Sequence, residues 1–154
     1  HADLREDYLE ERFSHATVLH RVWDLVGDGK IFQFGIRSGD RSEFVWAKDH
    51  VFTNKFNFHG LKEIVDQLKE KPVYFTLDLD VLDPSVFPGT GTPEAGGVSF
   101  QELLEAMIQV SHLNIVGFDV NELSPVYDQS GSSTAMACKV LRELLIAVMK
   151  NRAE

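Results

Sequence analysis

The sequence is poor in cysteine, in positive charge and in long apolar runs. A single cysteine excludes a disulfide within the chain and is usual in a reducing compartment, so we expect a cytoplasmic protein. Because Cys138 lies in an apolar, helix-like segment, we expect its thiol to be buried. No apolar run approaches the roughly 20 residues that cross a bilayer, which argues against a membrane-spanning helix. Lysine and arginine number 15 against 24 acidic residues, and the net charge of −9 argues against a nucleic-acid partner and suits a cationic one.

The length of 154 residues and the hydrophobic fraction of 44% predict one globular domain covering residues 1–154. Apolar periodicity predicts helices at residues 14–25 and 60–69, a helix opened by Ser99 with Glu102 as a capping box, and a last helix at 132–150. Residues 37–48 are polar and predict a loop. Alternation of these helices with predicted strands indicates an α/β fold, in which a mostly parallel sheet carries helices on both faces as a three-layer αβα structure. The predicted strands cover residues 31–36, 51–52, 73–80 and 114–120.

An acid-rich stretch at residues 76–84 follows the apolar start of the third predicted strand. If the strand continues to its end, Asp78 and Asp80 share one face, where two like charges repel unless a cation lies between them. A divalent metal explains the pair. The alternative is a pair of solvated turn acids. Apolar residues on both faces of the strand, such as Tyr74 and Leu77, predict that it is buried, and this favours the metal.

Further candidate ligands lie at the ends of other predicted elements. Ligands of parallel sheets bind beyond the carboxyl ends of the strands. Asp119 and Glu122 lie at or just past one such end, and His1 and Asp3 would fit another if a strand preceded them. Carboxylates with imidazole suit magnesium or manganese better than zinc, and the imidazoles favour manganese. Two such ions can generate a hydroxide nucleophile, but the acids do not say whether it attacks a carbon or a phosphorus centre.

Several other residues have ordinary structural interpretations. Asp83, next to Pro84, is expected to organise its turn by accepting backbone N–H bonds. Asp119 is expected to have a structural role or to contact a metal-binding side chain, rather than to bind the metal itself. The proline- and glycine-rich loop at 88–93 lacks the lysine of a phosphate-binding loop and is expected to wall the metal site. Four histidines show no partner pattern and are expected at the surface or at helix ends: His20, His50, His59 and His112.

Five short motifs follow one another along nearly the whole chain: HADLR at 1–5, SHA at 14–16, LDLDVLDP at 77–84, PGTGTP at 88–93 and ELSP at 122–125. In these motifs the chain resembles the ureohydrolase family, which includes arginase and agmatinase. The acidic strand end followed by PGTGTP is the most specific feature. The detail is most similar to bacterial agmatinases, since Gly89 stands where arginases more often have alanine and YDQS follows at 127–130.

The resemblance implies a dinuclear manganese centre, with two Mn²⁺ ions per subunit. His15 matches a histidine that shuttles protons to the leaving amine, and Glu122 matches the carboxylate that receives the guanidinium, so both are implied catalytic and substrate-binding residues. Without the resemblance, His15 is more typical of a capping or surface histidine, and Glu122 is more typical of a solvated loop acid. The implied metal ligands are His1, Asp3, Asp78 and Asp80, with Asp78 implied as the bridge between the two ions.

The resemblance further implies hydrolysis of agmatine, a small cationic guanidino compound, to urea and putrescine in polyamine biosynthesis. Alternatives within the family are guanidinobutyrase, guanidinopropionase, arginase and formiminoglutamase. Two alternatives to ureohydrolase activity are a non-catalytic binding module of the same fold and a dinuclear hydrolase of phosphoesters or acetylated amines. A cytoplasmic homo-oligomer, trimer or hexamer, with no membrane or nucleic-acid partner is expected.

Relatives are about twice this length, and their pattern needs a further upstream histidine and an aspartate two residues before His1. We therefore expect the sequence to be the C-terminal part of an arginase/deacetylase-like domain, with its N-terminal strands missing.

Overall fold

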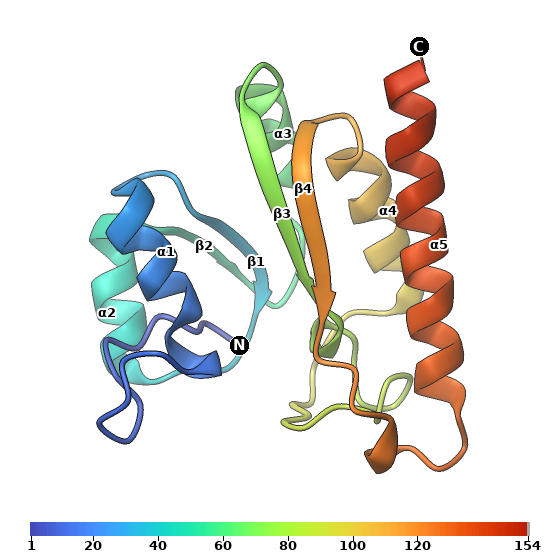
Figure 1. Cartoon of the computed structure of the whole chain (residues 1–154), viewed down its shortest axis with the longest axis horizontal. Coiled ribbons are helices and arrows are strands. Elements are labelled where there is room, and N and C mark those ends of the chain that lie inside the picture. Colours follow the sequence, from blue (N-terminus) through green and yellow to red (C-terminus); the bar gives the residue numbers. More distant parts are fainter. Residues whose placement is uncertain (154) are drawn as a thin grey trace. The chain divides into compact units, whose positions relative to one another are not determined.

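The computed structural model describes residues 1–153 and contains two compact units, His1–Asn57 and the residues from Phe58 onward (Figure 1). Helices and strands alternate in both units, and strands pair in parallel, as the sequence predicts. The single domain predicted from the length stays a prediction. Among the described residues, no helix combines the length and the apolar character that crossing a membrane requires.

The first unit is a β-α-β unit preceded by a short helical segment. Strands β1 (Phe32–Ile36) and β2 (Phe52–Lys55) are parallel and are joined by α2 (Arg41–His50). The 3₁₀ turn η1 (His15–Thr17) and helix α1 (Val18–Val26) precede them. The core of this unit is aliphatic and consists of Ala2, Leu4, Ile31, Ile36, Ala47 and Val51.

Helix α2 replaces the loop predicted at residues 37–48, so that prediction is wrong. Asp40 is the N-cap, and its capping box with Glu43 is complete: the Glu43 carboxylate accepts a hydrogen bond from the Asp40 N–H at 2.6 Å. The Asp-x-x-Glu spacing was therefore a helix signal. The polar composition concealed it, because the helix buries only a narrow side that includes Glu43 itself and Ala47.

The second unit contains a further parallel pair, β3 (Pro72–Asp78) and β4 (Asn114–Asn121), joined through α4 (Phe100–Val110). The capping box predicted for α4 is present between Ser99 and Glu102. Helix α3 (Leu61–Leu68) precedes the pair. In Figure 1, α4 and α5 (Ser132–Ala153) lie on one side of it.

Two details of the second unit differ from the predictions. Tyr74 and Val116 are each 63% exposed, so β3 is not buried on both faces. The physical reason is that α4 and α5 lie on the same side of the strand pair. Cys138 is exposed, because α5 turns Ala137 and Val140 inward and leaves the cysteine between them on the outer side.

The end of β3 also differs from the prediction. The strand stops at Asp78, and Leu79–Val81 form the 3₁₀ turn η2. Asp80 therefore does not belong to the strand, and the prediction that Asp78 and Asp80 share a strand face is wrong. The turn makes Asp80 only 2% exposed, whereas Asp78 is partly accessible.

Candidate active site and metal ligands

The second unit places three candidate carboxylates at one end of its strand pair. Asp78 is the last residue of β3, Asp80 lies in the turn that follows, and Glu122 comes directly after β4. In the parallel register Asp78 faces Asn121, so Glu122 is one residue beyond the partner of Asp78. The carboxyl ends of parallel strands are where such sheets bind ligands. The register therefore brings the backbone of Asp78 and Glu122 to the same end of the strand pair, and the convergence of the three side chains on one site stays a prediction.

The glycine-rich loop at residues 88–93 lies against the segment that follows Glu122. The Ser124 N–H donates to the Gly89 carbonyl at 2.7 Å, and the Gly89 N–H donates to the Ser133 hydroxyl at 2.8 Å. A Cβ at position 89 would lie 2.6 Å from the Ser133 Cβ, so this close approach requires glycine. Asp128 accepts the Ser133 N–H at 2.7 Å, and its bonds to Ser130 and Ser133 lower the pKa of its carboxyl. These contacts fix the loop to the start of α5.

Asp83 organises its turn as predicted. Its carboxylate accepts N–H bonds from Ser85 (3.0 Å), Gly96 (2.9 Å) and Gly97 (3.0 Å). Contacts with the Ser85 side chain and backbone, followed by those from the two glycines, lower the Asp83 pKa to about 2. A Cβ at Gly97 would lie 2.5 Å from the Asp83 backbone nitrogen, so the loop closes only with glycine there.

Asp83→Asn should remove a stabilisation that depends on pH. The folded pKa of about 2 lies below the ordinary value of 3.8, so the contribution is fully present above pH 3.8 and is lost as the pH falls through 2. We expect chemical denaturation to show a larger difference in unfolding free energy between wild type and variant at pH 5 than at pH 2. The exposed Asp66→Asn on α3 serves as control. A difference that stays constant across this range would contradict the assignment.

The first unit places its candidate ligands at the end of β1. The Ala2 N–H donates to the carbonyl of Ser38, just past β1, at 2.9 Å. Ala2 and Leu4 are buried in the core, at 0% and 2% exposure, whereas His1 and Asp3 are partly accessible. The His1–Asp3 segment therefore runs beside a residue just past the carboxyl end of β1, whereas the strand predicted to precede His1 lies outside residues 1–154 and stays a prediction.

His15 lies in a turn that is bonded to this same segment. Ser14 caps η1 by accepting the Ala16 N–H at 3.3 Å, as predicted. The Arg5 N–H donates to the Ala16 carbonyl at 3.1 Å, and the Leu19 N–H, in the first turn of α1, donates to the Asp3 carbonyl at 3.1 Å. The imidazole of His15 is exposed. The first unit thus holds the backbone of the Asp3 segment beside the turn that carries this histidine.

Two candidate residues have an unusual backbone. Asp3 has φ = 55° and Glu122 has φ = 67°, in the left-handed region that residues other than glycine rarely adopt. Such a conformation costs on the order of 1–2 kcal/mol per residue, and strained residues concentrate at functional sites. Neither conformation is signalled by the sequence.

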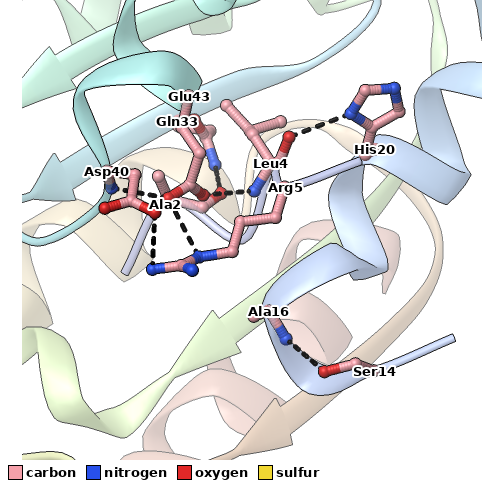
Figure 2. Close-up of polar contacts among 9 residues, drawn as sticks. All are labelled: Ala2, Leu4, Arg5, Ser14, Ala16, His20, Gln33, Asp40 and Glu43. Carbon is pink, nitrogen blue, oxygen red and sulfur yellow. Dashed lines mark hydrogen bonds and ion pairs between the residues drawn. The ribbon is translucent and has the colours of Figure 1, made fainter. Parts of the chain in front are cut away.

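Three buried polar residues contact the His1–Leu4 segment, and the sequence did not predict these contacts (Figure 2). Glu43 accepts the Leu4 N–H at 2.8 Å, and the Gln33 side-chain amide donates to the Ala2 carbonyl at 2.7 Å. His20, predicted at the surface or at a helix end, lies in the first turn of α1 but is only 8% exposed, so a surface position is wrong. Its Nδ1 lies 2.9 Å from the Leu4 carbonyl oxygen, which can only accept, so this nitrogen carries the proton.

The donor set has the chemistry predicted for manganese. Three carboxylates provide hard oxygen donors, and one imidazole adds a nitrogen donor. Two of the four, His1 and Asp3, belong to the first unit, and Asp78 and Asp80 belong to the second. Over residues 1–153, no group of three or more His, Cys, Asp or Glu side chains is gathered closely enough to hold a metal ion. The four-residue centre therefore stays a prediction.

Comparison with known proteins places these motifs in a family. A sequence model of the Arginase family matches residues 1–147. The chain belongs to the arginase family. The resemblance expected from the five motifs is thereby confirmed, and similarity to arginase-family structures confirms the α/β class as part of a three-layer αβα fold.

Similar arginase-family proteins carry the name agmatinase. The agmatinase of Bacillus anthracis is 46% identical over 155 residues, which cover 97% of this chain and 53% of that protein. A crystal structure assigned to an agmatinase of Clostridium difficile shows 52% identity and a TM-score of 0.93, covering 96% of this chain and 55% of the other. The agmatine ureohydrolase of Thermoplasma volcanium shows 32% identity and a TM-score of 0.85, covering 99% and 54%. The chain spans about half the length of the curated relatives it matches.

Proposed function

We propose that the complete polypeptide is a dinuclear manganese ureohydrolase that cleaves agmatine to urea and putrescine, and that residues 1–154 form the C-terminal part of its catalytic domain. The relatives named agmatinase support the substrate. The observation that carries the proposal is the register of β3 and β4, which puts Asp78 and Glu122 at adjacent strand ends. The Asp78 carboxylate, which would bind the metal, would then lie beside the Glu122 carboxylate, which would bind the guanidinium.

Four side chains would hold the two manganese ions: His1 and Asp3 from the segment beside the end of β1, Asp78 from the end of β3, and Asp80 from the turn that follows it. When bound, divalent ions act as Lewis acids and make water a nucleophile at neutral pH. The protein would supply the fixed positions of the donors. In the second unit, the bonds of Asp83 and Gly89 to neighbouring backbone and side chains hold the surrounding loops.

Glu122 would receive the substrate. A guanidinium is a planar fork of N–H donors that pairs with a carboxylate through two parallel hydrogen bonds. This pairing fixes the plane of the guanidino carbon and offsets its positive charge. The resonance of the guanidinium resists attack, so orientation must supply much of the rate.

His15 would deliver a proton to the departing nitrogen. An imidazole exchanges protons near neutral pH, and this one is accessible on a capped turn bonded to the Asp3–Arg5 segment. Protonation of the nitrogen allows the carbon–nitrogen bond to break, with urea and the amine as products.

The net charge of −9 suits a small cationic substrate. We propose a homo-oligomer, trimer or hexamer, in the cytoplasm, acting in polyamine biosynthesis. The other members of the family considered above differ in the tail of the substrate, which contacts loops that the motifs do not specify. Agmatine is preferred because the relatives described above carry its name.

A substrate panel tests this proposal. The manganese-loaded complete polypeptide would be assayed for urea from agmatine, arginine, 4-guanidinobutyrate and 3-guanidinopropionate, and for formamide from formiminoglutamate. We expect agmatine to give the highest kcat/KM. A higher value for another compound would reassign the substrate within the family, and no product from any of them would contradict the proposed activity.

A further inference from the structure

The buried carboxylate of Glu43 joins two backbone segments of the first unit. One oxygen accepts the Leu4 N–H at 2.8 Å, and the other accepts the N–H of Asp40, the N-cap of α2, at 2.6 Å. Glu43 is 4% exposed, so these bonds are shielded from water. A carboxylate only accepts hydrogen bonds, and here each oxygen is used for one donor.

Arg5 closes this cluster on the accessible side. Its Nη2 lies 2.9 Å from the Asp40 carboxylate, and its Nε lies 3.6 Å from the Glu43 carboxylate (Figure 2). A charge as buried as that of Glu43 is costly unless it is paired and hydrogen-bonded. The Arg5 ion pair and the two N–H bonds provide this compensation.

The same backbone segment is held at two further points. The Gln33 amide donates to the Ala2 carbonyl at 2.7 Å, and His20 Nδ1 donates to the Leu4 carbonyl at 2.9 Å. Side chains thus bond to the backbone immediately before and after Asp3, whose φ of 55° is otherwise unfavourable. Fixing the peptide groups on both sides of Asp3 fixes the direction in which its side chain leaves the backbone.

We infer that Glu43 is a positioning residue, which holds Asp3 in its left-handed conformation and so sets His1 and Asp3 for metal binding. The inference rests on the proposed function, since it assumes that these two residues are ligands. Glu43 acts through the Leu4 backbone and does not itself contact the ion. Groups that orient metal ligands typically change metal affinity or activity by about 10- to 100-fold when they are removed.

The variant Glu43→Gln tests this inference in the complete polypeptide. The amide keeps the size of the side chain but replaces one acceptor oxygen with an NH₂ donor, so either the Leu4 or the Asp40 N–H loses its partner. Free Mn²⁺ would be followed by electron paramagnetic resonance during titration of the metal-free protein, which measures affinity independently of activity. We expect the dissociation constant of at least one ion to rise by about 10- to 100-fold.

Glu102→Gln is the matched control. Glu102 is the equivalent capping-box glutamate of α4, where it accepts the Ser99 N–H at 2.8 Å, and among the described residues 1–153 none of its hydrogen bonds involves the segment 1–5. Loss of a helix cap destabilises both variants by similar mechanisms, whereas Mn²⁺ affinity should fall only in Glu43→Gln. An equal effect of the two variants would mean that Glu43 serves stability alone, and this would overturn the inference.

If Glu43→Gln cannot be obtained as a folded protein, Gln33→Met provides a second test. It removes the donor to the Ala2 carbonyl and should likewise raise the dissociation constant for Mn²⁺. Wild-type affinity in the recovered variants would overturn the positioning role and leave the proposed function intact. Failure of the wild-type polypeptide to bind Mn²⁺ would contradict the proposed metal centre, and the inference with it.

Discussion

Replacing Asp78 with asparagine should remove metal and activity together. Asp78 ends β3 one register position away from Glu122, and it is the carboxylate proposed to bridge two ions. Removal of a group that merely orients a ligand costs about 10- to 100-fold in metal affinity or activity, so loss of a bridging ligand should exceed about 100-fold. The amide oxygen of asparagine is uncharged and neutralises no part of the charge of the two cations.

The measurement for Asp78→Asn combines elemental analysis of manganese after dialysis with the rate of urea release from agmatine. Asp66→Asn makes the same chemical change at an exposed site on α3 and should leave both values at the wild-type level. Wild-type manganese content and turnover in Asp78→Asn would refute its assignment as a ligand.

Glu122→Gln should impair substrate use while leaving the metal in place. The amide retains one acceptor oxygen but presents an NH₂ donor to the guanidinium, so the paired hydrogen bonds and the charge compensation are lost. A hydrogen bond to a charged group contributes about 1.5–3 kcal/mol, and a loss of about 3 kcal/mol corresponds to a fall of roughly 100-fold in kcat/KM. The effect should appear mainly as a higher KM.

Steady-state kinetics on agmatine, with manganese content measured on the same preparations, test the role of Glu122. Glu63→Gln, an exposed change in the first turn of α3, is the control. Unaltered kinetics in Glu122→Gln would refute the guanidinium contact. Loss of manganese with unchanged KM would instead assign Glu122 to the metal.

Local signals predicted most of the fold. Apolar runs located β1, β3 and β4, and the cap at Ser14 and the capping box at Ser99 located two helix starts, because these features depend on residues a few positions apart. Helix α2 was missed although Asp40 and Glu43 carry the same capping signal, since its polar surface outweighed its short buried side. The turn after Asp78 was missed because an alternating pattern does not mark where a strand stops.

The site could be predicted only as far as the motifs reach. The positions of Asp78 and Glu122 at neighbouring strand ends follow from sequence alternation and parallel pairing. The contacts of Glu43 and His20 with Leu4 join residues 39 and 16 positions apart, and no local pattern contains them. The left-handed backbone of Glu122 is likewise not marked by a local sequence pattern.

The most direct test of the account is the location of manganese in a crystal of the complete polypeptide. Anomalous scattering from manganese-loaded crystals should show two ions bridged by Asp78, with His1, Asp3 and Asp80 among the ligands. The Glu122 carboxylate should face the position that the guanidinium of the substrate would occupy. An ion bound elsewhere, or His1 and Asp3 remote from Asp78 in the metal-loaded protein, would contradict it.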